Sequence, residues 1–187
     1  MDDTQIIALY NQRDERAIAE TSGKYGDYCY AIAYNILSDR QDAEECLNDT
    51  WLGAWNAIPP DCPANFKLYL AKITRNLSFN RYKLKNRKKR GGSETETLLD
   101  EIEEFLPDST NVEKEIEDNE FIQAVNSFLR TLPERERGIF IRRYFYSEKT
   151  PVISRRYGMK EDTVLKTLSR TRIKLKYYLK GEGFNNG

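Results

Sequence analysis

Basic and aromatic residues are interleaved in one stretch of the chain, KITRNLSFNRYKLKNRKKRGG, at positions 72–92. Between Lys67 and Arg90 ten residues are Lys or Arg and none is acidic, and Phe79 and Tyr82 lie among them. Cations bind a phosphate backbone, and bases that have left a duplex stack on aromatic rings, with about 1–3 kcal/mol per base. The combination is typical of a surface that binds single-stranded or melted DNA.

A helix from about residue 66 to about residue 90 is predicted to position these groups. Its apolar residues recur every three or four positions and lie within about 40° of one line, as in a stripe that faces a core. The stripe consists of Phe66, Leu70, Ile73, Leu77 and Leu84, which leaves Lys72, Arg75, Phe79 and Tyr82 on the opposite, solvent face. The alternative is that Phe79 and Tyr82 pack against a neighbouring helix and that the basic run is a solvated helix end.

A second candidate for DNA binding is the segment TPVISRRYGMKEDTVLKTLSRTRIKLKYYL, at positions 150–179. Thr150 is a good N-cap, Pro151 suits the first helical position, and Gly158 suits a helix end. A longer helix is predicted from Glu161, with Val164, Leu168, Thr171 and Leu175 as its buried stripe and with Lys166, Ser169, Arg170 and, near the edge, Arg172 on the other side. This order predicts a helix-turn-helix whose second helix enters the major groove, although any two-helix hairpin with a Gly turn has the same pattern.

The segment before it, residues 128–144, predicts a pair of helices broken by Pro133. We expect Arg142 and Arg143 to lie off the apolar face of this pair, where a phosphate group or a protein partner could meet them. The apolar face, which would form a small core beneath the helix-turn-helix, consists of Phe128, Leu129, Leu132, Ile139, Phe140 and Tyr144.

A helix predicted from about residue 41 to about residue 58 has a different outward face. Its inward stripe is Ala43, Leu47, Thr50 and Ala54, with Trp51 alongside. The residues that point away are Glu45, Asn48, Asp49, Leu52 and Asn56. An outward face that combines acids and amides with one Leu and has no cation does not bind DNA, so it is either a protein-docking surface or plain solvated surface.

The net charge of zero hides a strong alternation along the 187 residues. Residues 1–60 carry −7, residues 61–92 carry +9, residues 93–120 carry −11 and residues 121–187 carry +9. Two basic blocks far apart in sequence suit a polyanionic partner. The acidic block between them is interpreted as a linker, partly disordered alone, which is either a solvated spacer or a segment whose charge could mimic nucleic acid or follow a basic channel in a partner.

Composition also argues against several classes of protein. The chain has no His, no metal-ligand cluster, no Gly-rich phosphate loop and no nucleophile beside a base, so we expect no catalytic residues, no metal and no cofactor. Its three Cys suggest neither a disulfide framework nor a zinc site. No apolar run approaches the roughly 20 residues of a membrane span, so we expect a cytoplasmic protein without membrane insertion. Helical spacing dominates, and the predicted class is all-α.

The order of these segments resembles the extracytoplasmic-function (ECF) group of sigma-70 type RNA polymerase sigma factors. Residues 42–52 resemble the family's acidic Asp-Ala-Glu-Asp-x-x-Gln-Glu-x-Phe segment, and residues 66–77 resemble its Phe-x-x-Trp-Leu-x-x-Ile-Ala-Arg-Asn segment. Leu132-Pro133 through Tyr144, followed by Gly158-Met159 and residues 163–175, resemble its C-terminal helix-turn-helix domain. The resemblance implies a sigma-2-like helical bundle at residues 1–92, an acidic flexible linker at 93–118 and a sigma-4-like helix-turn-helix domain at 119–187.

The resemblance also implies roles for individual residues. Core polymerase would dock through its β′ clamp helices on Asp42, Glu45, Asn48, Asp49 and Leu52. The minus-10 element of promoter DNA would be recognised and opened by Lys72, Arg75, Asn76, Phe79, Asn80, Tyr82 and Lys83. The minus-35 element would be read by Lys160, Thr163, Lys166, Ser169, Arg170 and Arg172, in a domain that also contacts the polymerase β flap.

A sigma factor of this kind has no catalytic activity and directs core polymerase to promoters. An anti-sigma factor is a common partner in the family, but no residue of the sequence identifies one. Two rival functions remain open at this point. One is a helix-turn-helix regulator that binds duplex DNA without polymerase, and the other is a sigma-like protein that binds polymerase or an anti-sigma factor without initiating transcription.

Overall fold

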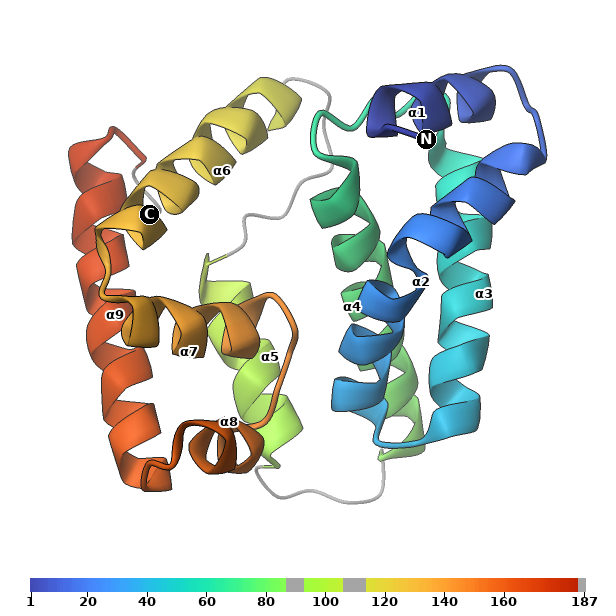
Figure 1. Ribbon diagram of the computed structural model, residues 1–187. Helices are drawn as coiled ribbons and strands as arrows, with labels where there is room; N and C mark the ends of the chain where they lie inside the picture. Colours follow the sequence, from blue (N-terminus) through green and yellow to red (C-terminus); the bar gives the residue numbers. More distant parts are fainter. Residues whose placement is uncertain (87–92, 106–113, 185–187) are drawn as a thin grey trace. The chain divides into compact units, whose positions relative to one another are not determined.

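The computed structural model describes residues 1–86, 93–105 and 114–184, with the backbone alone for residues 103–105 and 114–119. Over these ranges the chain forms nine helices and no strand (Figure 1), so the predicted all-α class is confirmed. No helix in the described ranges combines the length and the apolar character that crossing a membrane requires.

The chain divides into two compact units, Met1–Ser93 and Glu94–Gly187. The first unit contains α1 (Asp3–Asn11), α2 (Arg16–Leu37), α3 (Arg40–Ala57) and α4 (Phe66–Lys85). The second unit contains α5 (Glu94–Phe105), α6 (Lys114–Thr131), α7 (Glu134–Tyr144), α8 (Thr150–Tyr157) and α9 (Glu161–Gly181).

The acidic segment expected to be a partly disordered linker is helical at both of its described ends. Residues 94–105 form α5, residues 114–118 begin α6, and residues 106–113 lie outside the described part of the chain. Thr95, Leu98 and Ile102 of α5 are buried, since the i, i+3, i+7 spacing places them on one side of the helix. The first part of this segment therefore belongs to the second unit as a packed element.

Side-chain caps mark where α3 and α4 begin. The Asp39 side chain accepts a hydrogen bond from the Asp42 N–H at 2.9 Å at the start of α3, and the Asn65 side chain accepts one from the Leu68 N–H at 3.1 Å at the start of α4. Each cap satisfies an N–H group that lacks a partner within its helix.

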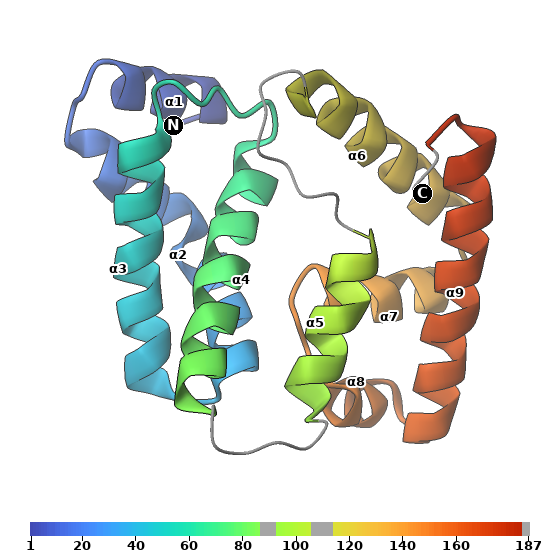
Figure 2. The ribbon, with the colours of Figure 1, turned by 180° about the vertical axis from the view of Figure 1, so that it is seen from behind.

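The core of the first unit forms where α4 packs against both α2 and α3 (Figure 2). Phe66 is buried at its centre, with ring centroids 5.9 Å from both Tyr10 and Tyr25 in edge-to-face contacts. On α3 the predicted inward residues pack as expected, because Ala43, Thr50, Trp51 and Ala54 are buried and Leu47 is half-buried in the core.

In the second unit α7 and α8 pack with α9, and α6 lies along α9 (Figure 1). The predicted buried stripe of α9 is confirmed, since Val164, Leu168, Thr171 and Leu175 are each at most 2% exposed. Gly158 ends α8 with φ +60°, a left-handed conformation that Gly adopts without steric cost. The six residues predicted to form the core across α6 and α7 are all buried.

Gly138 lies in α7 at a close approach to α8. A Cβ atom added to Gly138 would lie 2.2 Å from Oη and 3.3 Å from Cζ of Tyr157. We expect Gly138→Ala to lower the melting temperature, with a cost of about 1–3 kcal/mol for the overpacking, although Ala normally stabilises a helix interior relative to Gly. Thermal unfolding followed by circular dichroism measures this effect.

The control adds Tyr157→Phe to Gly138→Ala, because Tyr157→Phe removes the oxygen atom that the new Cβ would contact. Gly138→Ala combined with Tyr157→Phe should recover most of the lost melting temperature. A Gly138→Ala protein that melts at or above the wild-type temperature would contradict the close packing of α7 on α8.

Candidate nucleic-acid interface

The exposed face of α9 carries the polar residues predicted for the helix-turn-helix. Thr163, Lys166 and Arg170 are exposed and Ser169 is half-buried, all outside the buried stripe of α9, and Lys160 is exposed at the N-cap just before the helix. The turn before α9 and the capped end of α8 hold this face away from the core of the unit. The arrangement can place cations and hydroxyl groups in a groove of duplex DNA.

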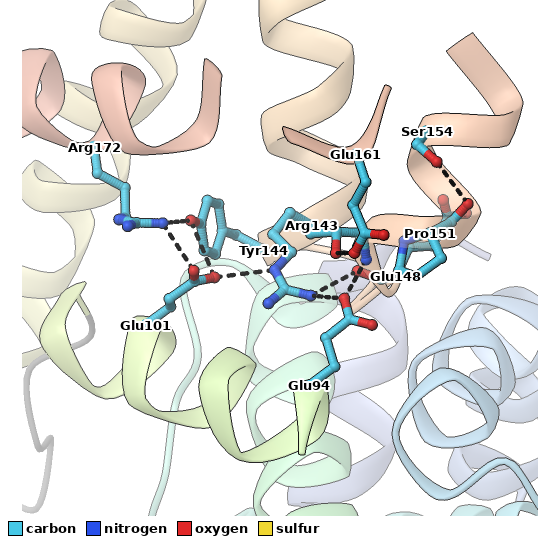
Figure 3. A network of polar contacts seen from close by, with 10 residues as sticks. Glu94, Glu101, Arg143, Tyr144, Glu148, Pro151, Ser154, Glu161 and Arg172 are labelled. Carbon is cyan, nitrogen blue, oxygen red and sulfur yellow. Dashed lines mark hydrogen bonds and ion pairs between the residues drawn. The ribbon is translucent and has the colours of Figure 1, made fainter. Parts of the chain in front are cut away.

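Arg172 was predicted to belong to the same face, but its guanidinium group is engaged inside the unit. The side chain is 21% exposed, and Nη1 donates hydrogen bonds to Glu101 Oε1 at 3.0 Å and to Tyr144 Oη at 2.7 Å (Figure 3). Burial, and next the negative charge of Glu101, raise the pKa of Tyr144 to about 12, so this hydroxyl group is neutral at pH 7. Arg172 is therefore held by α5 and α7 in this structure.

Arg143 was predicted to lie off the apolar face, and this prediction is wrong. Its side chain is 0% exposed and forms ion pairs with Glu94 and Glu101 of α5, each at 3.0 Å. Arg143 also donates a hydrogen bond to the Glu148 carbonyl oxygen at 3.2 Å (Figure 3). The physical reason is that α5 packs on α7 and brings two carboxylates to a position that would otherwise face solvent.

Glu94 has a second role at the start of α8. Its carboxylate accepts a hydrogen bond from the Thr150 N–H, which explains why α8 begins at Thr150 instead of using it as the predicted N-cap. The Thr150 hydroxyl group in turn donates to Glu161 at the start of α9, at 2.8 Å. Glu94 and Glu101 are seven residues apart and so share one face of α5, a spacing in the sequence that could have indicated a common partner.

On α4 the buried arc is wider than the predicted stripe. Arg75 and Phe79, expected on the solvent face, are only 7% and 4% exposed, whereas Leu84, expected in the core, is 60% exposed. Burial lowers the pKa of Arg75, while Tyr28 and Cys29 of α2 shift it in the opposite direction. One apolar stripe predicted one packing partner, but α4 has α2 on one side and α3 on the other, so more of its surface is buried.

The remaining polar residues predicted for α4 share one side of the helix. Asn76, Asn80 and Lys83 are exposed and Lys72 is half-buried, and at 100° per residue the four lie within about 80° of arc. Tyr82 is half-buried on another side, with its hydroxyl group 2.7 Å from Ser93 Oγ. The candidate nucleic-acid surface of α4 is thus built from two amides and two cations instead of aromatic rings.

The outward face of α3 contains the residues predicted for protein docking. Glu45, Asn48, Asp49, Leu52 and Asn56 are all exposed as predicted, with Leu52 57% exposed. Asp42 differs, because it is only 7% exposed and pairs with Lys85 and Arg81 of α4. A hydrogen bond from Lys85, followed by the charges of both cations, holds the pKa of Asp42 below its usual range.

Arg81 of α4 pairs with the acidic side of α3, a contact that the sequence did not reveal. Its guanidinium group lies 2.5 Å from Glu45, 3.2 Å from Asp49 and 3.5 Å from Asp42, so it neutralises charge along the acidic side of α3. The acids follow one another at i, i+3 and i+7, which would have indicated a cation opposite them on a packed helix. The open part of the face is then Asn48, Leu52 and Asn56.

Among the residues that the structure describes, no group of three or more His, Cys, Asp or Glu side chains could hold a metal ion.

Comparison with known proteins gives two matches to family descriptions. Residues 23–88, in the first unit, match "Sigma-70 region 2", and residues 122–175, in the second unit, match "Sigma-70, region 4". Together these two regions cover more than half of the chain, in the order expected from the sequence.

One relative is the "ECF RNA polymerase sigma factor SigE" of Mycolicibacterium smegmatis, 23% identical over 156 residues. The match covers 83% of this chain and 59% of the relative, so the chain spans less than two thirds of that protein's length. A solved structure described as "Structure of CnrH in complex with the cytosolic domain of CnrY" is 19% identical, with a TM-score of 0.45 and coverage of 96% of this chain and 97% of that chain.

The burial of Phe79 gives a testable prediction. Phe79→Ala should destabilise the protein by about 3–5 kcal/mol, the usual cost of truncating a buried Phe to Ala. Asn80→Ala, at the adjacent exposed position, is the matched control and should stay within about 0.5 kcal/mol of the wild type. Urea unfolding measures both changes, and equal stability of the two variants would show that the Phe79 ring is not packed.

Proposed function

We propose that this chain, which belongs to the ECF group of the sigma-70 family of RNA polymerase sigma factors, binds core RNA polymerase and directs it to promoter DNA. The observation that carries this proposal is the helix-turn-helix, where Lys166 and Arg170 are exposed on α9 opposite its buried stripe. Sigma factors are non-enzymatic subunits, so the proposed activity consists of binding and strand opening.

The minus-35 element is assigned to the exposed face of α9. Lys166 and Arg170 would contact phosphate groups or base edges, and Lys160, Thr163 and Ser169 lie beside them near the start of the helix. Cations near the N-terminal part of a recognition helix are well placed to meet both the backbone and the major groove. Arg172 belongs to this surface only if it leaves Glu101.

The minus-10 element is assigned to the polar side of α4. Asn76 and Asn80 can each donate and accept hydrogen bonds at a base edge, and Lys72 and Lys83 can neutralise phosphate groups beside them. Phe79 and Arg75 are not included, because burial keeps them from contact with DNA in this conformation. Tyr82 is the aromatic residue of the original prediction that keeps partial exposure.

Docking of core polymerase is assigned to the open part of α3. Leu52 lies centrally between Asn48 and Asn56, and Glu45 and Asp49 border it. An exposed Leu surrounded by polar groups fits the apolar centre and polar rim of a protein interface. The β′ clamp helices, the β flap and an anti-sigma factor are proposed as partners from the family resemblance.

In vitro transcription with purified core polymerase tests the proposal. Core polymerase with this protein should start transcription at defined sites on promoter templates selected for the complex, and core polymerase alone should not. If the protein binds duplex DNA tightly without polymerase and directs no start, it is a helix-turn-helix regulator. If it binds core polymerase without directing any start, it is a sigma-like binding protein.

The docking face gives a sharper test through two exposed leucines. Leu52→Asp should weaken binding to core polymerase at least about 10-fold, because it places a charge at the centre of the proposed interface. Leu84→Asp is the matched control, since Leu84 is as exposed as Leu52 (60% against 57%) but belongs to α4 and not to α3. Binding is measured by titration of labelled protein with core polymerase, and a similar loss for both variants would contradict docking through α3.

A further inference from the structure

The cations of α9 differ in what they contact. Lys166 and Arg170 are exposed, and neither forms an ion pair with a residue that the structure describes. Arg172 lies at the border of the buried face, and its guanidinium group contacts the Glu101 carboxylate and the Tyr144 hydroxyl group (Figure 3). An acidic side chain of α5 thus occupies an anion position beside the basic face of the helix-turn-helix.

A phosphate group can take the same position on a guanidinium group as a carboxylate. Arg binds both through parallel N–H donors, and each such contact is charge-assisted. Glu101 also places a negative charge near the path of any phosphate that approaches Arg172. The contact therefore opposes DNA binding in two ways, by occupying the donor and by repelling the ligand.

Arg172 can exchange its partner without loss of α5 from the unit. α5 is anchored separately, because Glu94 and the second oxygen of Glu101 pair with Arg143, which is 0% exposed. Separation of α5 from Arg143 would leave a buried charge without its partners, which is strongly unfavourable. The Arg172 side chain is 21% exposed, so a movement of this side chain alone can bring it to solvent.

We propose that Arg172 is a latent phosphate contact for duplex DNA and that Glu101 of α5 opposes its use. The proposal rests on the proposed function, since it requires that α9 binds DNA. The ligand is a backbone phosphate of the promoter duplex, which is the anion nearest to a helix that already presents Lys166 and Arg170. The acidic α5 then sets how many phosphate groups the helix-turn-helix contacts.

The test is the salt dependence of DNA binding by the full chain. A duplex is first selected from random sequence with the wild-type protein and saturating core polymerase, and is then labelled with fluorescein. Each protein variant is titrated into this duplex at about 50–200 mM salt, and binding is followed by anisotropy. Lys166→Gln should reduce the slope of log K against log salt by about 0.9, the value for one lost phosphate contact. Arg172→Gln in the otherwise wild-type chain should change the slope much less, because Glu101 already holds Arg172.

Glu101→Gln should remove the ion pair that holds Arg172 and so free Arg172 to contact a phosphate group. Gln keeps hydrogen-bonding capacity towards Arg143 while the charge is lost, so we expect duplex binding about 5- to 10-fold tighter at 0.1 M salt and a slope steeper by about 0.9. Addition of Arg172→Gln should remove this gain. Asp100→Asn is the matched control, since it removes one negative charge from an exposed position of the same helix.

Three results would overturn the proposal. The first is that Arg172→Gln reduces the salt slope as much as Lys166→Gln does. The second is that Glu101→Gln binds DNA no more tightly than Asp100→Asn does. The third is that the tighter binding of Glu101→Gln persists when Arg172→Gln is added. Melting temperatures identify variants that fail to fold, and the comparison of Lys166→Gln with Arg172→Gln decides the question without Glu101→Gln. Tighter binding to core polymerase alone would assign Arg172 to a protein carboxylate and also contradict the proposal.

The same experiment separates this inference from the proposed function. If no duplex is selected, or if Lys166→Gln binds as the wild type does, DNA binding by α9 is wrong and the role of Glu101 falls with it. If Lys166→Gln loses a contact while Glu101→Gln behaves as Asp100→Asn, only the role of Glu101 is wrong.

Discussion

The helix-turn-helix unit is organised around a guanidinium group that has no exposed surface. Arg143 is buried completely, and a buried charge is tolerated only when carboxylates and hydrogen bonds surround it. Glu94 and Glu101 supply these carboxylates from α5. Glu94 also accepts a hydrogen bond from the N–H group of Thr150, the first residue of α8. The Thr150 hydroxyl group donates a hydrogen bond to Glu161 at the start of α9. The position of the start of α9 therefore depends on an acidic segment that its composition alone would class as a linker.

Ion pairs also join two helices of the first unit, but their side chains are less buried than Arg143. Arg81 of α4 faces three carboxylates of α3, and Lys85 pairs with the most buried of these, Asp42. Ion pairs with exposed partners contribute little to the free energy of unfolding, about 0–1 kcal/mol each. Their main consequence is the character of the surface. They neutralise the acids of α3 and leave Leu52 with two amides as the part open to a protein partner.

These two arrangements explain how a chain with no net charge can carry two basic surfaces. In each unit some of the acidic side chains are used against cations of a neighbouring helix, while other cations stay exposed. On α9 the exposed cations are Lys166 and Arg170, and on α4 Lys83 is exposed and Lys72 half-buried beside Asn76 and Asn80. The electrostatic field at each surface thus depends on which cations are paired with carboxylates of the same unit and which are not. Under the proposed function, this distribution would decide where DNA binds.

Local patterns in the sequence were enough to predict α3, α4, α7, α8 and α9, and the buried faces of α3 and α9. The stripe of α9, the inward residues of α3 and the end of α8 at Gly158 follow from helical spacing and from the conformational freedom of Gly, and all were found as predicted. The width of a buried face was not predictable, because it depends on how many helices pack around it. For this reason the prediction that Arg75 and Phe79 face solvent was wrong.

The partners of the charged residues were decided by the tertiary structure alone. Arg143 and Glu101 are 42 residues apart, and Arg172 and Glu101 are 71 apart, so no local spacing relates them. The sequence determined that the chain has two basic blocks, an acidic block between them and helices with one apolar face each. Only the packing of α5 in the second unit determined that Arg143 is internal and that Arg172 is paired with Glu101, because ion pairs form between side chains that the fold brings within reach.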